Sequence, residues 1–191
     1  MNDIVISGLC KRFGDKVVLD SLDMTLRGGE ISCIMGESGC GKSTLIKLIM
    51  GIYRADSGTI AGIPSKISAV FQEDRLCEDF SALTNVKITA ARSVSSHQIA
   101  EDFKALGLDG NQKTPARELS GGMRRRVALM RAMLAEGELI VLDEPFSGLD
   151  PENRALAIEY IRARRGGRTM IVVTHDADDA AALGASDVIR L

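Results

Sequence analysis

The chain lacks any apolar run that approaches the roughly 20 residues needed to cross a bilayer. Its first residues, Met1-Asn2-Asp3, also lack the basic and then apolar pattern of a secretory signal peptide. Internal repeats and low-complexity tracts are missing as well. We therefore expect the 191 residues to form a single compact domain, large enough to bury a substantial core, that stays in the cytoplasm.

Paired cysteines are also lacking, because Cys10, Cys33, Cys40 and Cys77 form no C-x-x-C pattern. This spacing favours free thiols in a reducing compartment. Cys10 and Cys33 are interpreted as core packing, whereas Cys40 lies in the glycine-rich segment described below.

Neither sign of charge dominates, since 24 basic residues face 26 acidic ones. This balance argues against a broad nucleic-acid-binding surface, and we expect no nucleic-acid partner. The basic run Arg124-Arg125-Arg126 is interpreted as the solvated face of a helix.

What the chain does have is a phosphate-binding pattern of the form G-x-x-x-x-G-K-[ST]. Glycines in such a segment let backbone N–H groups turn inward around an anion, and the helix that follows adds its positive end. The alternative is a glycine-rich structural turn. The matching residues, which we expect to bind the nucleotide, are Gly36, Glu37, Ser38, Gly39, Cys40, Gly41, Lys42, Ser43 and Thr44.

The flanking sequence fits this interpretation. Residues 31–35 are continuously apolar or small, as in a buried strand, and the apolar spacing of residues 45–49 predicts a helix that stops at Gly51. Lys42 would place a positive charge on the β- and γ-phosphates, and the Ser43 hydroxyl would bind Mg²⁺.

Two carboxylates follow the apolar strand predicted at residues 139–142. At the tip of a buried strand, Asp143 and Glu144 need a partner to offset their desolvation. A phosphate-bound Mg²⁺ supplies one for Asp143, and Glu144 is then placed to take a proton from an attacking water. The alternative is a strand-end pair that faces solvent.

A second anion-binding helix start is predicted at Ser120-Gly121-Gly122. Ser120 is a good N-cap, and the two glycines leave the amides uncovered. A simple capped helix, expected here over residues 124–136, is the alternative.

Alternating strands and helices predict a parallel α/β core. Period-two alternation at Leu22, Met24 and Leu26 predicts an antiparallel sheet in the N-terminal part, and residues 83–108 are helical in pattern. Asp150 and Asp176 are expected to cap helices. Further strands are predicted at residues 59–61, 69–71, 169–173 and 187–191.

Taken in order, these motifs resemble the ATP-binding cassette (ABC) family of transporter ATPases. The resemblance covers almost the whole chain. It implies a P-loop NTPase fold over residues 1–191, with an antiparallel β subdomain and core to about residue 72, a helical lobe over about 73–125 and the core again over about 126–191. It rests on Gly36–Thr44 (Walker A), Gln72, Leu119–Met123 (the signature), Leu139–Glu144 (Walker B), Ser147–Asp150 and His175.

The resemblance also implies roles for single residues. Two cassettes would bind ATP head to tail, so that Ser120, Gly121 and Gly122 reach the γ-phosphate of the other subunit's ATP. Glu144 would be the general base, and His175 would contact the γ-phosphate. Gln72 would orient water and Mg²⁺, Asp150 would bridge the subunits, and Phe13 would stack on adenine unless it is a core residue.

This sequence departs from the family pattern at three positions. Met123 and Arg125 stand where the family usually or frequently has glutamine, and Glu37 stands where a small residue is common. We expect activity to survive, because the anion-binding amides precede Met123. The contacts made by the signature segment should nevertheless change.

The resemblance favours an ATPase subunit, in a homodimer or heterodimer, that powers integral membrane permease subunits from the inner face of the cell membrane. Residues 71–76 resemble importer ATPases for nitrate, sulfonates and taurine. The alternatives are a non-transport ABC ATPase, for example of the cluster-assembly type, and a small-molecule kinase. The sequence does not identify the cargo.

Overall fold

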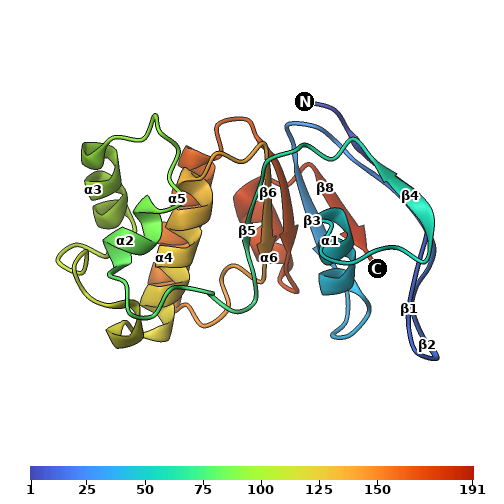
Figure 1. Ribbon diagram of the computed structural model, residues 1–191, viewed down its shortest axis with the longest axis horizontal. Coiled ribbons are helices and arrows are strands. Elements are labelled where there is room, and N and C mark those ends of the chain that lie inside the picture. The colour runs from blue at the N-terminus through green and yellow to red at the C-terminus, as the bar shows by residue number, and fades with distance from the viewer.

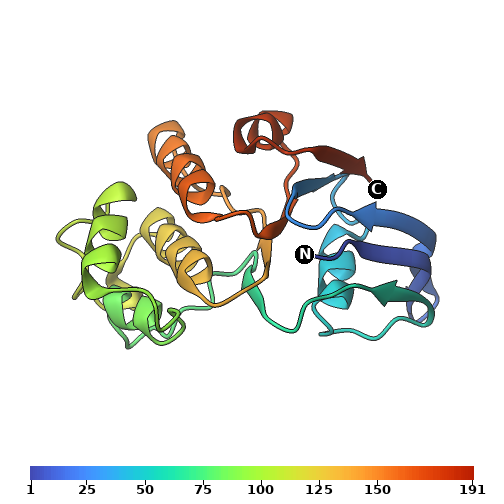
Figure 2. The same cartoon turned by 90° about the horizontal axis from the view of Figure 1, so that it is seen from above.

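The computed structural model describes all 191 residues and places a parallel sheet between an antiparallel sheet and a set of helices (Figures 1 and 2). The antiparallel sheet has the order β2-β1-β4. Its residues alternate between buried and exposed positions because one face covers the core and the other faces solvent. Its strands are β1 (Ile4–Phe13), β2 (Lys16–Leu26) and β4 (Ser57–Ala61).

The parallel sheet has the order β5-β6-β7-β3-β8, and it confirms the predicted α/β core. The three inner strands β3, β6 and β7 are almost entirely buried because both faces are covered, whereas the edge strand β8 alternates between half-buried and exposed residues. In β6, Leu139 and Val141 pack in the cluster that includes α1, whereas Ile140 and Leu142 pack in the cluster that includes helix α4 (Gly121–Leu134). The bounds are β3 (Ile31–Met35), β5 (Ile67–Val70), β6 (Leu139–Asp143), β7 (Thr169–Val173), β8 (Asp187–Arg190) and α1 (Lys42–Ile49).

The remaining helices lie on the other face of this sheet and in a lobe beside it (Figure 2). None of the helices has the length and apolar character that a membrane crossing requires. The bounds are α2 (Ala82–Lys87), α3 (Ser96–Ala105), α4 (Gly121–Leu134), α5 (Pro151–Arg164) and α6 (Ala177–Leu183), with a 3₁₀ turn at Ala116–Glu118.

The predicted helical region over residues 83–108 is two helices, each capped by a serine. Ser81 caps α2 by accepting the Thr84 amide, and Ser95 caps α3 by accepting the Gln98 amide. The predicted return to the core at residue 126 falls inside α4, which packs against both α2 and β5 and so joins the lobe to the core.

Several predicted boundaries were wrong. Strands β4 and β5 each begin two residues before the predicted start, and β8 ends one residue early, at Arg190. Helix α4 begins at Gly121 instead of residue 124 and ends at Leu134 instead of continuing to residue 136, and β5 ends at Val70, one residue before the predicted end. The chain leaves α4 early because Gly137 passes close to strand β5. A Cβ at that glycine would lie 2.8 Å from the Ser68 amide nitrogen.

The interpretation of the Arg124–Arg126 run as a solvated face was also wrong. Arg125 and Arg126 are both buried. Arg126 Nη1 donates to the Leu106 carbonyl oxygen at 2.6 Å, at the end of α3. A buried guanidinium is stable there because it satisfies backbone carbonyls that would otherwise lack donors.

A buried carboxylate holds the lobe to the core at a second place. Asp102 of α3 is completely buried, and it accepts hydrogen bonds from the Tyr160 hydroxyl at 3.0 Å and from Arg164 Nε at 3.0 Å, both on α5. Gln98 Nε2 adds a third, at 2.8 Å. A buried charge requires partners of this kind.

Candidate functional site

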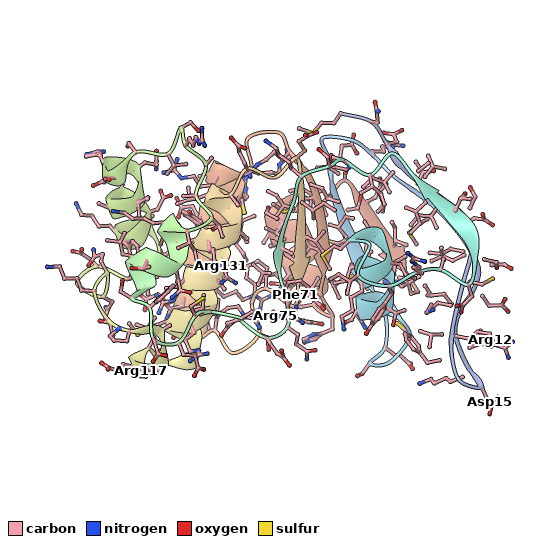
Figure 3. All side chains as sticks on the ribbon, in the orientation of Figure 1. Arg12, Asp15, Phe71, Arg75, Arg117 and Arg131 are labelled. Atoms are coloured by element: carbon pink, nitrogen blue, oxygen red, sulfur yellow. The ribbon has the colours of Figure 1, made fainter.

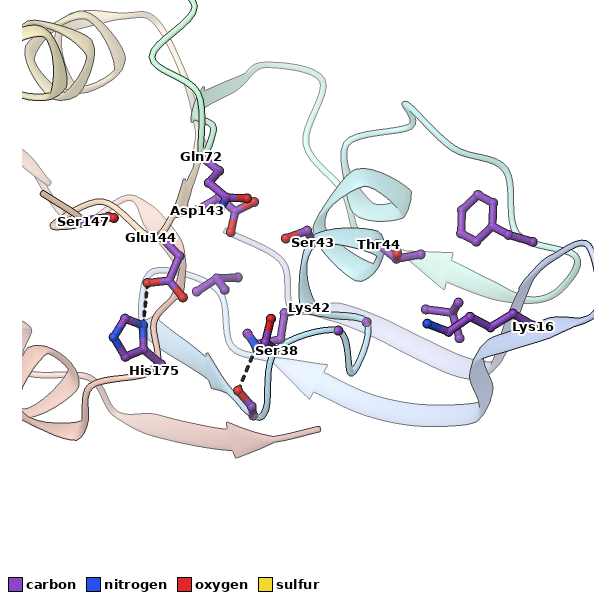
Figure 4. A pocket seen from close by; sticks show the side chains of 16 residues that line it. Lys16, Ser38, Lys42, Ser43, Thr44, Gln72, Asp143, Glu144, Ser147 and His175 are labelled. Atoms are coloured by element: carbon purple, nitrogen blue, oxygen red, sulfur yellow. Dashed lines mark hydrogen bonds and ion pairs between the residues drawn. The ribbon is translucent and has the colours of Figure 1, made fainter. Parts of the chain in front are cut away.

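A cavity of about 510 Å³ lies where β3, β6 and β7 end, at the carboxyl edge of the parallel sheet (Figure 4). Open α/β sheets bind ligands at this edge. The cavity brings together twelve of the site residues predicted from the sequence: Phe13, Gly36, Ser38, Gly39, Gly41, Lys42, Ser43, Thr44, Gln72, Asp143, Glu144 and His175.

The loop between β3 and α1 is shaped around Lys42. Its Nζ donates to the carbonyl oxygens of Gly36 and Glu37, both at 2.8 Å (Figure 4). Gly41 has φ +112°, and a Cβ there would lie 3.0 Å from a Leu19 methyl carbon. Only glycine combines that backbone conformation with so close an approach.

Helix α1 starts without a side-chain cap, because its N-cap is Gly41. The first N–H groups of a helix have no acceptor within the helix, and here no capping side chain competes for them. These amides, together with the helix dipole and Lys42, suit a bound phosphate.

Three oxygen-bearing side chains from different segments line the same part of the cavity. They are Ser43 at the start of α1, Gln72 after β5, and Asp143 at the end of β6. Burial raises the pKa of the Asp143 carboxyl, while the Ser43 hydroxyl opposes that rise. Because Mg²⁺ prefers oxygen ligands, this donor set fits a magnesium ion.

Glu144 is held in an unusual backbone conformation. Its φ is +50°, and its amide donates to the Val173 carbonyl oxygen at 2.9 Å. The side chain then meets His175, with Glu144 Oε2 3.0 Å from His175 Nδ1. The histidine side chain is 75% exposed, so it faces the cavity and solvent. Strained backbone of this kind persists where the surrounding structure fixes it, as at functional sites.

Phe13 is not a core residue, since it is 46% exposed and lines the cavity. Its ring meets Tyr53 edge to face at 5.5 Å between centroids. Lys11 Nζ lies 5.3 Å from the ring centre, and the exposed part of the ring faces the cavity, where it can stack on a flat ligand group.

We expect Phe13→Ala to weaken ATP binding by roughly 2- to 10-fold, because an aromatic stacking contact contributes about 0.5–1.5 kcal/mol. Titration with a fluorescent ATP analogue measures the change. Phe80→Ala is the matched control, because Phe80 is also 46% exposed but lies on the lobe outside the cavity. Equal losses in the two variants would remove Phe13 from the nucleotide site.

Three lining residues were missed in the sequence. Lys16 and Val18 reach the cavity from β2, and Val173 lies at the end of β7. Ser147, named in the sequence only as part of the Ser147–Asp150 motif, lines the cavity as well. The short turn at Gly14-Asp15 could have predicted Lys16 and Val18 as lining residues, because a hairpin there places β2 beside Phe13.

The structure does not bring every predicted binding residue into this cavity. The side chains of Glu37 and Cys40 line a second cavity, beside Arg190 and Leu191. Ser120, Gly121 and Gly122 stand at the start of α4, and none of them lines the cavity of its own chain. Ser120 caps α4 as predicted, by accepting the Met123 amide at 3.3 Å.

The remaining cysteine predictions are mixed. Cys33 is buried, as expected for core packing, and burial raises its thiol pKa to about 11. Cys10 is only half-buried, so its interpretation as core packing was wrong. All four thiols are free.

Residues 19–147 match the protein family described as ABC transporter. The chain is 38% identical over 184 residues to the aliphatic sulfonates import ATP-binding protein SsuB 3 of Paraburkholderia xenovorans (strain LB400), covering 94% of this chain and 73% of that protein. It is 39% identical over 187 residues to SsuB 2 of Rhodococcus jostii (strain RHA1), covering 94% and 75%. Among solved structures, a dimeric bacterial ABC transporter cassette, MJ0796, superposes with a TM-score of 0.83 at 26% identity, covering 98% of this chain and 94% of that one.

Proposed function

Because this chain belongs to the ABC transporter family, as one of its ATP-hydrolysing subunits, we propose that it powers an importer by closing around ATP as a head-to-tail dimer. The observation that carries the proposal is the cavity in which Lys42, Asp143, Glu144 and His175 meet. A phosphate cradle, a metal-side carboxylate and a candidate base are thus within one site.

The chain's own residues divide the work in this site. Lys42 and the amides at the start of α1 bind the phosphates, and Glu144 takes the proton of the attacking water. His175 holds the Glu144 carboxylate in place and contacts the terminal phosphate. Ser43, Asp143 and Gln72 would hold Mg²⁺, which when bound neutralises charge on the β- and γ-phosphates.

The position of the signature supports a dimer. Ser120, Gly121 and Gly122 begin a 14-residue helix, yet they lie outside their own chain's cavity. A helix start of this kind attracts the γ-phosphate of a neighbouring chain only while that phosphate is present. Hydrolysis would then weaken the dimer, because ATP binds the closed state more tightly than the open one.

Mixing two inactive variants tests this arrangement. Lys42→Ala removes the cradle, and Ser120→Arg blocks the signature, so each homodimer has two damaged sites. In a mixed dimer both lesions fall on one site, and the other site is intact, as head-to-tail symmetry requires. We therefore expect the mixture to hydrolyse ATP faster than the sum of the two variants. A mixture that stays inactive would contradict a site shared between chains.

Transport is the favoured use of this ATPase because the relatives are named as import ATP-binding proteins. We propose that the partner is an integral membrane permease and that the chain works at the inner face of the membrane. Purification of the tagged chain from detergent-treated membranes tests this. Polytopic membrane subunits should copurify, and a soluble cluster-assembly complex in their place would favour the non-transport ATPase. The kinase alternative is tested by the reaction product, because a kinase would form a phosphorylated metabolite in place of free phosphate.

A further inference from the structure

The segment that carries Gln72 lacks backbone hydrogen bonds that would fix its position. Residues 71–76, called the Gln72 loop below, leave β5 and lead into the lobe. No backbone–backbone hydrogen bond joins any of these six residues to the rest of the chain. Some other contact must fix the loop, because the Gln72 side chain lines the nucleotide cavity.

Arg125 supplies that contact from helix α4. Its Nη1 donates to the Phe71 carbonyl oxygen at 2.7 Å, and its Nη2 donates to the Gln72 carbonyl oxygen at 2.6 Å. The same guanidinium lies 3.3 Å from Asp74 Oδ1, and the Arg125 side chain is only 7% exposed. Hydrogen bonds from a charged donor in a buried place are strong and directional.

Arg131, six residues further along α4, holds the other half of the loop. It donates to the carbonyl oxygens of Asp74 and Arg75, at 2.9 and 2.7 Å. Arg75 has φ +47°, and its guanidinium lies 3.8 Å from the centre of the Phe71 ring. Figure 3 shows Phe71 and Arg75 together below Arg131, between the sheet and the lobe.

We propose that Arg125 is a positioning residue that aims Gln72 into the nucleotide site and makes the Gln72 loop move with the signature. Arg125 follows Ser120 by five residues on the same helix. A displacement of α4 that moves Ser120 must therefore also pull on the Gln72 carbonyl. The inference rests on the role proposed above for Gln72.

The chemistry explains why arginine suits this position. A planar guanidinium reaches two adjacent carbonyl oxygens at once and stays charged while it faces Asp74. Lysine is shorter and carries its three donors on one nitrogen, so it cannot reproduce the planar two-nitrogen contact. Arg125→Lys should therefore keep the charge and the fold, while losing the paired hydrogen bonds from Nη1 and Nη2 to the two carbonyls.

The test compares Arg125→Lys, Arg125→Ala and Gln72→Ala, each alone, and Arg125→Lys combined with Gln72→Ala. The readouts are kcat, the Mg²⁺ concentration at half-maximal hydrolysis, the affinity for a fluorescent ATP analogue in excess chelator, and the melting temperature. Arg131→Ala is the matched control, since it also loses two hydrogen bonds to the same loop but none to Gln72.

If Arg125 acts through Gln72, both Arg125 variants lower kcat by roughly 10- to 100-fold, as a displaced catalytic group does. They also raise the Mg²⁺ requirement, and the metal-free affinity stays unchanged. In the Gln72→Ala background the lysine change then costs less than about twofold, because the two residues act as one unit.

Losses that multiply in the double variant would overturn the inference, as would an equal shift of the Mg²⁺ requirement in Arg131→Ala. If Arg125→Ala fails to fold, the test still stands, because the double-mutant cycle uses Arg125→Lys and Gln72→Ala. A Gln72→Ala variant with a normal Mg²⁺ requirement would instead contradict the proposed role of Gln72, and the inference would fall with it.

Discussion

Glu144→Gln is expected to lower the turnover of ATP by roughly 10²- to 10⁴-fold, which is the usual contribution of a general base. The amide keeps the size of the side chain and cannot accept the water's proton. The Glu144 backbone, held by the Val173 carbonyl oxygen, should not move. ATP binding should survive, because the phosphate cradle is built by other groups, Lys42 and the amides at the start of α1.

Phosphate release and size-exclusion chromatography in the presence of ATP measure the two halves of this prediction. The variant should hydrolyse slowly and elute as a dimer that persists for longer than that of the unaltered chain. Glu138→Gln is the matched control, because Glu138 is exposed at the opposite end of β6. Near-normal hydrolysis in Glu144→Gln would assign the base to another residue.

Lys42→Ala is expected to weaken ATP binding by roughly 10- to 100-fold, since a hydrogen bond from a charged group contributes about 1.5–3 kcal/mol. Lys42 is 9% exposed, so its charge acts in a poorly hydrated place. The variant also leaves the Gly36 and Glu37 carbonyl oxygens without their donor. Part of the loss should therefore come from a looser loop.

Isothermal titration with ATP in excess chelator measures this affinity without the metal. Lys47→Ala, in the last turn of the same helix, is the control for helix stability. The melting temperature without nucleotide separates a damaged fold from a lost ligand contact. An unchanged ATP affinity would remove Lys42 from the cradle.

Short-range signals predicted most of the nucleotide cavity. The Gly36–Thr44 pattern, the apolar strand before Asp143 and the cap residues Ser120 and Asp150 each act within a few neighbours, and the structure places them as expected. Parallel strands must then end at one edge, so residues from distant parts of the chain meet there.

Long-range packing decided what the sequence could not show. Arg125 and Arg126 look solvated in sequence, and their burial depends on carbonyls more than 15 residues away. The positive φ of Glu144 depends on a hydrogen bond to β7. The Lys16 side chain reaches the cavity only because β2 folds back beside β1.

The hydrogen bonds of Asp102 link movements of the lobe to helix α5. Asp102 ties α3 to the far part of α5 through Tyr160 and Arg164, and the first residue of α5 follows Asp150 directly. A tilt of the lobe that moves α3 would therefore also move the 14-residue helix α5 and Asp150, which is expected to bridge the two subunits. A push by a membrane partner on the lobe would thus reach the predicted dimer contact through α5 as well as through the Gln72 loop.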